Sequence, residues 1–535
     1  MKGDNLKEQE RTKLHNTIWR IANELRGSVD GWDFKAYVLG FLFYRFISEN
    51  LVNYLNAEER KTGVADFNYA ELSDDQAEFG REDTVNDKGF YILPSELFEN
   101  VRKRAKNDES LNETLSKIFR NIEQSAKGFD SEDDFRGLFD DLDVNSNKLG
   151  PTVTRRNERL VKLMNAIGEL ELGKFEDNTI DAFGDAYEYL MTMYAGNAGK
   201  SGGEFFTPQE VSELLAKITV VGKTSVNKVY DPAAGSGGMF VWSEKFVEER
   251  AGRVSDIAVY GQELNETTWR LAKMNMAIRG IDANIKRGDT LMDDQLPDLK
   301  ADYILANPPF NISDWGQEHL QTDPRWKYGL PPKGNANFAW IQHMIHHLSP
   351  RGTAGFVLAN GSMGSQTGGE GDIRKQLVLN DMVDAIVTLP SQLFFNVAIP
   401  CCLWFVSRDR ANRRGKVLFI DGRNLGKMVT RRNRELTEED IARIAKTYHD
   451  YKTVSADYAD QPGFCKVANL EEIKQHDYVL TPGRYVGVEE AEEDDEPFAE
   501  KFARLTAVLE GQFAKSHELE AKIKENLAKI EKEIK

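Results

Sequence analysis

Apolar residues in the first 170 positions of the chain recur at helical spacing, separated by polar turns. Two such series are Ile18, Ile21 and Leu25, and then Tyr37, Phe41 and Tyr44. This pattern predicts an all-helical N-terminal domain over residues 1–170. The polar, acidic stretch from Asn68 to Lys88 shows little periodicity, and we expect a loop or an insertion there.

From Lys228 to about Val406 the pattern changes to short apolar runs that alternate with amphipathic segments. Strand and helix in alternation predict an open α/β sheet of mainly parallel strands, a Rossmann-like architecture. We expect this domain to span residues 171–487, with a helix at 337–349 and further strands up to Arg408. The Gly-rich stretch from Gly364 to Asp372 is expected to be a loop, either a lid or a plain surface connection.

The last segment, residues 488–535, begins with an acidic run from Glu489 to Glu496 that is typical of a solvated linker. Apolar residues then follow at steps of four and three: Phe498, Phe502, Leu505, Leu509, Leu519, Ile523 and Ile530. Polar Gln512, Ser516 and Asn526 interrupt the series. The pattern predicts a long amphipathic helix. We expect its apolar side to dock another subunit, for example as a coiled coil with a partner helix; the alternative is that the helix folds back on the N-terminal domain.

The amino-acid composition indicates which partners and which cellular compartment to expect. The 535 residues include 69 Lys and Arg against 87 Asp and Glu, a formal net charge of -18, so the overall field opposes nucleic acid. Three cysteines are too few for a disulfide scaffold. The N-terminus lacks the apolar core of a signal peptide, and the most apolar stretch is short and contains Arg45. We therefore expect a cytoplasmic protein with no membrane contact.

The segment from Asp231 to Gly238, DPAAGSGG, follows the predicted strand KVY and precedes a helix. Glycines at such a turn let a ligand approach the backbone, and a helix N-terminus favours negatively charged groups. The spacing differs from a dinucleotide fingerprint. By itself the segment could be only a tight turn.

Two acidic residues follow at the ends of the next predicted strands, Glu263 in GQEL and Asp289 in KRGD. A carboxylate at such a strand end can accept hydrogen bonds from ribose hydroxyls. Each acid alone could be a surface charge, but with the Gly-rich turn they fit an adenosine-containing ligand.

The predicted strand DYILA ends in Asn307-Pro308-Pro309-Phe310. Each proline fixes φ and removes a donor, so the turn is stiff and exposes the Asn side chain and a proline carbonyl. Two acceptors beside an aromatic face can hold the amino group of a flat base or amide while its nitrogen receives a methyl group.

DPAAGSGG together with NPPF resembles the S-adenosylmethionine-dependent amino-methyltransferases of DNA. GGEFFTPQEV, from Gly202 to Val211, is similar to the family segment that closes over the methionine moiety. The N-terminal run from Ile18 to Asn50 and the late segment HDYVLTPGRYVG resemble the modification subunits of type I restriction-modification systems.

This resemblance implies that S-adenosylmethionine is the cofactor and assigns a role to each matching residue. Asn307 and the Pro308 carbonyl would hold the target amino group on the stiff turn with Pro309, and Phe310 would stack on a flipped adenine. The family more often has Tyr at the last place, and Phe keeps the stacking face. The cofactor-binding residues it implies are Glu204, Phe205, Phe206, Thr207, Pro208, Gln209, Asp231, Gly235, Ser236, Gly237, Gly238, Glu263 (ribose) and Asp289 (adenine amino group).

The function implied is methylation of adenine N6 in a specific sequence of double-stranded DNA. The implied partners are a specificity subunit, a restriction subunit and a second copy of this chain. Alternatives are a free-standing methyltransferase acting on DNA or on protein glutamine, and a non-catalytic assembly subunit.

Two further groups of residues were open to a functional interpretation. His343, His346 and His347 share one predicted helix, but the chemistry requires no metal, and we expect a solvated or capping role near the helix end. The basic runs 407–416 and 428–435 could contact DNA phosphates or be ordinary surface charge.

Overall fold

The structure is a computed structural model that describes residues 12–20, 33–64, 66–170, 172, 182–197, 207–219, 228–243, 257–394, 400–429, 433–488 and 498–534. The chain consists of two compact units, Met1–Val486 and Gly487–Lys535. None of the described helices is both long enough and apolar enough to cross a membrane.

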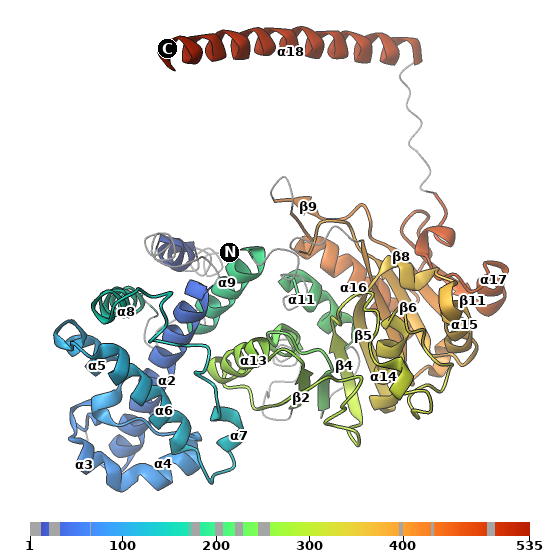
Figure 1. The fold of residues 1–535 in the computed structure, drawn as a ribbon. Coiled ribbons are helices and arrows are strands. Elements are labelled where there is room, and N and C mark those ends of the chain that lie inside the picture. Colours follow the sequence, from blue (N-terminus) through green and yellow to red (C-terminus); the bar gives the residue numbers. More distant parts are fainter. Residues whose placement is uncertain are drawn as a thin grey trace. The chain divides into compact units, whose positions relative to one another are not determined.

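The N-terminal part of the first unit is helical, as predicted. Its helices include α2 (Asp33–Lys61), α3 (Asp74–Ala77), α4 (Arg81–Lys88), α5 (Phe98–Arg104), α6 (Leu111–Ser125), α7 (Glu132–Phe135), α8 (Val153–Gly168) and α9 (Ala182–Asn197). They enclose an apolar core in which Tyr44 packs edge-on against Phe98 and Phe119, with ring centroids 5.5 and 5.4 Å apart. In Figure 1 these helices are drawn from blue to teal.

The expectation of a loop from Asn68 to Lys88 is wrong. This stretch forms the short turns η1 (Tyr69–Glu71) and η2 (Glu78–Gly80) and the helices α3 and α4. Ser73 and Gln76 form a capping box that starts α3. Each piece is one or two turns long and buries at most two side chains, so no helical periodicity could develop in the sequence.

Helix α9 belongs to the helical core although it follows the predicted boundary at residue 170. Phe183 packs against Phe46, and Tyr187 is fully buried. Helix α13 (Glu266–Arg279) reaches this core from the sheet region, with Arg270 Nη1 2.7 Å from Asp141 and Arg279 Nη2 2.9 Å from Glu188. The domain boundaries stay a prediction.

The rest of the first unit is built on a nine-stranded sheet, which confirms the predicted α/β fold. Its order is β11-β8-β6-β7-β5-β4-β1-β2-β3. The strands are β1 (Lys228–Asp231), β2 (Ala258–Glu263), β3 (Ala283–Arg287), β4 (Ala301–Ala306), β5 (Leu348–Ala359), β6 (Val383–Thr388), β7 (Cys401–Ser407), β8 (Lys416–Asp421) and β11 (Cys465–Asn469). Only β7 and β11 run antiparallel to their neighbours. A separate short hairpin pairs β9 (Lys427–Met428) with β10 (Arg434–Glu435).

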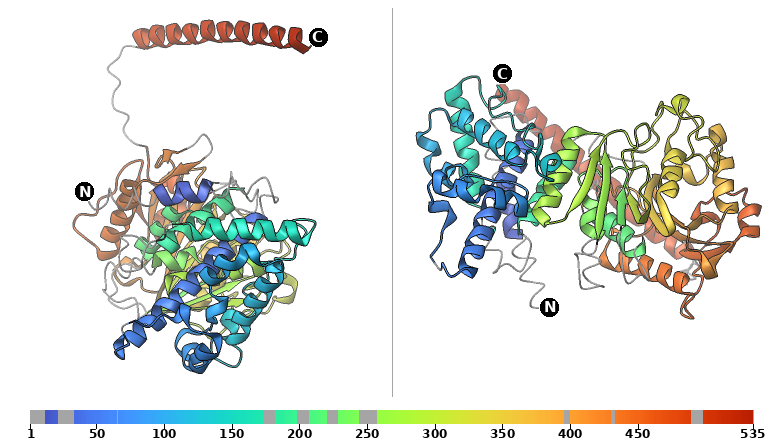
Figure 2. Two further views of the ribbon diagram at one scale, coloured as in Figure 1. Left: turned by 90° about the vertical axis from the view of Figure 1, so that its left-hand side faces the viewer. Right: turned by 90° about the horizontal axis from the view of Figure 1, so that it is seen from below.

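Helices cover both faces of the sheet, so its central strands are apolar on both sides. Along β4, Tyr303 and Leu305 enter one core, while Ile304 and Ala306 enter the other. The first core includes α11 (Gln209–Thr219) and α16 (Glu438–Thr453); the second includes α14 (Asn337–His347), α15 (Glu370–Leu379) and α17 (Leu470–Gln475). Figure 2 gives two further views of these layers.

The strand order reverses beside β1. The chain runs outward from β1 to β2 and β3, then crosses back to β4 on the other side of β1. Ligands of such sheets bind beyond the carboxyl ends of the strands at this reversal. The Gly-rich turn follows β1 and the Asn-Pro-Pro-Phe turn follows β4, so the fold places both at this point.

The predicted loop from Gly364 to Asp372 is half right. Residues up to Gly369 form a connection with the turn η9 (Thr367–Gly369), but α15 begins at Glu370. Gly368 and Gly369 both have positive φ, 62° and 87°, so glycines needed for the turn concealed the helix start in the sequence.

In the second unit the described residues form the helix α18 (Phe498–Ile534), which confirms the predicted long amphipathic helix. Its predicted apolar positions Phe502, Leu509, Leu519 and Ile523 are exposed along the helix surface.

Candidate active site

The Gly-rich turn reverses the chain at the end of β1. Gly235 and Gly237 have φ of +54° and +81°, a left-handed conformation that favours glycine. A Cβ on Gly237 would also lie 2.8 Å from the Met276 side chain of α13. A helix starts at residue 238, so the turn delivers a helix N-terminus to the sheet edge.

Glu263, at the end of β2, is joined to this turn. Its Oε2 accepts a 2.9 Å hydrogen bond from the Gly235 N–H, and its Oε1 accepts one of 2.8 Å from the Asn265 N–H. Burial raises the pKa of Glu263, and these backbone donors offset part of the rise. A carboxylate has about four acceptor positions, so Glu263 keeps capacity for ligand hydroxyls.

A cavity of about 890 Å³ lies at this edge of the sheet, and Glu263, Asp289 and Pro309 line it from three separate strand ends. Asp289 Oδ1 accepts from the N–H groups of Leu291 and Met292 at 3.0 and 3.1 Å. Among the described residues nothing donates to Asp289 Oδ2, which leaves it available to a ligand. The cavity also has exposed apolar walls, with Leu264 67% and Ile312 37% exposed.

Asn307 is buried where β4 ends. Its Nδ2 donates to Thr207 Oγ1 at 3.1 Å, which joins two predicted site segments a hundred residues apart. Its Oδ1 is buried and has no hydrogen-bond partner among the described residues. An unpaired buried acceptor is unfavourable, so this oxygen suits a donor from a ligand.

Hydrogen bonds between Asn337, at the start of α14, and Asn311 fix the end of the Asn-Pro-Pro-Phe turn. Asn311 has a φ of 54°; its backbone N–H donates to Asn337 Oδ1 at 3.1 Å, and its Oδ1 accepts from Asn337 Nδ2 at 2.9 Å. Phe310 is partly exposed and meets Phe394 edge to face, with ring centroids 6.1 Å apart.

Among the predicted residues that the structure describes, Glu263, Asp289 and Pro309 line the cavity, whereas Thr207, Gly235, Gly237, Gly238, Asn307, Pro308 and Phe310 are not part of its lining. Glu204, Phe205 and Phe206 are outside the described residues, and Pro208 and Gln209 line a separate cavity of about 410 Å³. Asp231 is buried behind the turn, where burial raises its pKa to about 8. Ser236 is also buried, and its carbonyl accepts from Asn275. The roles predicted for these residues stay predictions.

The sequence interpretation missed several cavity residues, among them Thr290, Leu291, Met292, Trp315 and Trp340. The first three directly follow Asp289 and could have been found as its continuation. Trp315 and Trp340 carried no sequence signal, because only the path of the chain after β4 brings them to the cavity.

Two other expectations are corrected. His343 and His347 are fully buried and neither solvated nor capping, because α14 is enclosed on nearly all sides; His346 alone of the three is partly exposed. In the first basic run, Arg410 and Arg413 are buried against Asp384, so these two side chains are structural and not part of the surface charge.

Comparison with known proteins gives the family. A family model described as N-6 DNA methylase matches residues 178–494, more than half of the chain, and one described as the HsdM N-terminal domain matches residues 14–167. The chain belongs to the N-6 DNA methylase family. Its activity is the methylation of adenine N6 in DNA, and it is of the modification-subunit type of type I restriction-modification systems.

The individual relatives of this methylase are also type I methylase subunits. The HindI methylase subunit of Haemophilus influenzae is 52% identical over 65% of this chain and 78% of its own length. The MpnII methylase subunit of Mycoplasma pneumoniae is 38% identical over 91% of both chains. A solved type I methyltransferase subunit from Streptococcus thermophilus is 28% identical, with a TM-score of 0.76 over 89% of this chain and 99% of its own.

Proposed function

We propose that the 890 Å³ cavity binds S-adenosylmethionine and that the Asn307–Phe310 turn beside it holds a flipped-out adenine. The observation that carries the proposal is the convergence of Glu263, Asp289 and Pro309, from three strand ends at the reversal of strand order, on one cavity.

The cavity offers groups for each part of the cofactor. The Gly-rich turn, which reaches the cavity wall with Pro232 and Ala233, is assigned the carboxylate end, Glu263 suits the ribose hydroxyls, and Asp289 Oδ2 suits the adenine amino group. Leu264 and Ile312 supply apolar surface that a flat ring would cover. When bound, this cofactor supplies a methyl group already activated on a sulfonium.

The target amino group would donate to Asn307 Oδ1, the acceptor that has no partner among the described residues, and to the Pro308 carbonyl. Two such bonds fix the nitrogen and favour a lone pair directed at the methyl group, so positioning replaces a strong base. The target must leave the duplex, at about a few kcal/mol, and stacking on Phe310 returns part of this.

The chain is proposed to act in a complex with a specificity subunit, a restriction subunit and a second copy of itself. Its net charge of -18 makes it a poor DNA ligand alone, so a partner that reads the sequence would also supply affinity for the duplex. The exposed apolar seam of α18 is suited to burial against a helix of the specificity subunit.

Calorimetric titration with S-adenosylhomocysteine tests the cofactor assignment. We expect the wild-type chain to bind, and Glu263→Ala to weaken binding about ten- to hundredfold through loss of a charged acceptor. Glu158→Ala is the control, because Glu158 pairs with Arg155 at the surface and does not line the cavity. Absence of binding by the wild-type chain, or equal loss in both variants, would contradict the proposal.

A further inference from the structure

Behind the wall of the cavity lies Arg325, a guanidinium only 7% exposed whose five N–H groups are all used. Nε and one Nη2 N–H donate to the carboxylate of Asp323, at 2.9 and 2.8 Å. The other three contacts reach groups far away in the sequence: the carbonyls of Thr290 (3.2 Å) and Leu291 (2.6 Å), and Nδ1 of His343 (3.1 Å).

The two carbonyls belong to the residues that directly follow Asp289 and line the cavity with it. Thr290 Oγ1 also donates to the Pro232 carbonyl at 2.6 Å, which ties this segment to the Gly-rich turn. Asp289 itself accepts from the N–H groups of Leu291 and Met292. Arg325 therefore fixes the peptide units whose opposite sides hold the Asp289 carboxylate.

His343 has one protonation state that fits its neighbours. Arg325 can only donate, so Nδ1 of His343 must accept, and the ring proton sits on Nε2, 3.0 Å from Tyr230 Oη in β1. Burial, the charge of His347 and the charge of Arg325 all hold the pKa of His343 well below its usual value. The ring is a neutral support that orients the guanidinium.

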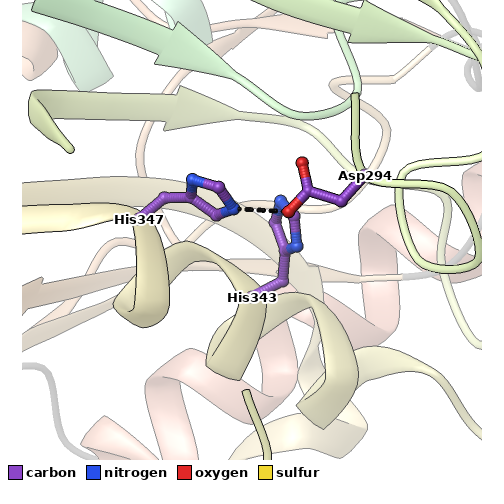
Figure 3. Close-up of side chains that lie close together, drawn as sticks. All are labelled: Asp294, His343 and His347. Atoms are coloured by element: carbon purple, nitrogen blue, oxygen red, sulfur yellow. Dashed lines mark hydrogen bonds and ion pairs between the residues drawn. The ribbon is translucent and has the colours of Figure 1, made fainter. Parts of the chain in front are cut away.

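One turn further along α14, His347 contacts the chain that continues from Asp289 to Leu299. Its Nδ1 faces the Leu299 carbonyl at 2.9 Å, and its Nε2 is 2.9 Å from Asp294 Oδ2, the contact drawn in Figure 3. Asp294, His343 and His347 thus resemble a metal site, but their nitrogens are occupied by Arg325, Tyr230, Leu299 and Asp294, and a cationic guanidinium lies in contact. The cluster is a hydrogen-bonded support for residues 289–299.

We propose that Arg325 is a positioning residue that sets the base specificity of the cofactor site, by holding Asp289 where it accepts only from an amino group. The inference rests on the proposed function, because it assumes that Asp289 faces the adenine of the cofactor. A guanidinium satisfies five acceptors in one plane, whereas a lysine ammonium has three donors and cannot replace it.

The test compares affinity for S-adenosylhomocysteine with affinity for S-inosylhomocysteine, in which a carbonyl oxygen replaces the amino group. The wild-type chain should prefer the adenosyl compound, because a carbonyl oxygen faces the Asp289 carboxylate unfavourably. In Arg325→Lys we expect a loss of adenosyl affinity of about ten- to hundredfold, and a preference for adenosyl over inosyl that falls towards one.

Arg374→Lys is the matched control. Arg374 is also buried and also donates to backbone carbonyls, those of Ser365 and Tyr478, but it does not line or support the cavity. It should keep the wild-type preference. If Arg325→Lys does not fold, as judged by thermal melting, the adenosyl-over-inosyl preference is measured for Asp323→Asn. This change weakens the two hydrogen bonds between Arg325 and the Asp323 carboxylate without removing the guanidinium.

The outcomes separate the two claims. A wild-type chain that binds neither compound contradicts the proposed function itself. A wild-type chain that binds S-adenosylhomocysteine, with a folded Arg325→Lys or Asp323→Asn that keeps the full preference, overturns the role of Arg325 alone. Equal loss of preference in Arg374→Lys also overturns it, because the effect would then be a general consequence of losing a buried arginine.

Discussion

At the scale of single residues, different side chains are assigned to the methyl donor, which is the cofactor, and to the methyl acceptor, which is the target base. Glu263 and Asp289 are fixed by backbone N–H groups, and each keeps acceptor capacity for a ligand. Asn307 stands apart from them, tied to Thr207, with its Oδ1 unpaired among the described residues. A change at Asn307 should therefore affect chemistry and leave cofactor binding intact.

Asn307→Ala is expected to lower kcat by about a hundredfold or more, because the target nitrogen loses a positioned acceptor in the transition state. The dissociation constant for S-adenosylhomocysteine should stay at the wild-type value. Turnover and calorimetry on the assembled complex measure the two effects, with the surface change Asn380→Ala as control. Near-normal turnover would remove Asn307 from its role.

Asp231 gives a prediction about pH and stability. Burial raises its pKa from 3.8 to about 8, so between these values the unfolded chain releases a proton that the folded chain keeps. This contribution to stability is present below pH 4 and is lost as the pH rises to 8. Across this range the loss proceeds at up to about 1.4 kcal/mol per pH unit.

Asp231→Asn removes the titrating proton and keeps an acceptor for the Ala233 N–H. Relative to wild type, its free energy of unfolding should rise between pH 5 and pH 8, as measured by urea denaturation without cofactor. A difference between the two proteins that does not change with pH would contradict the raised pKa.

At the scale of elements, the Gly-rich turn depends on one glycine more than on its neighbour. Gly237→Ala places a Cβ at φ +81° and 2.8 Å from Met276, and should lower the free energy of unfolding by about 1–2 kcal/mol. Gly238→Ala meets no atom within 4 Å at the start of a helix and should be neutral or slightly stabilising. Chemical denaturation of both variants measures this, and equal destabilisation would contradict the strained conformation.

The elements also show which parts of the fold could be predicted from the sequence. The strands and long helices of the sheet region were predictable, because β1, β2 and β4 are apolar runs of strand length and α13 has a capping Asn265 and a terminal Gly280. The short helices from Asn68 to Lys88 were not, since pieces of one or two turns carry no periodicity. Arg325 and Trp315 reached the site only through the tertiary path after β4, for which no local pattern exists.

At the scale of the whole molecule, the exposed seam of α18 predicts its role in assembly. Removing residues 496–535 should leave the melting temperature of the first compact unit and its cofactor affinity unchanged, while association with the specificity subunit is lost. Size-exclusion chromatography and calorimetry read out the two properties.

A finer variant keeps the helix. Leu519→Asp with Ile523→Asp places two charges on the seam and should prevent association, whereas Lys524→Gln, on another face of the helix, should not. A truncated chain that still assembles at normal affinity, or that no longer folds, would show that α18 is not the docking element.

The central claim is tested most directly by identifying the methylated atom. The chain is assembled with its partner subunits, incubated with target DNA and S-adenosylmethionine carrying an isotopically labelled methyl group, and the DNA is digested to nucleosides for mass spectrometry. We predict that the label appears as N6-methyladenine with the wild-type chain and is reduced about a hundredfold or more with Asn307→Ala. Label on another base or on protein, or an equal yield from Asn307→Ala, would contradict the account.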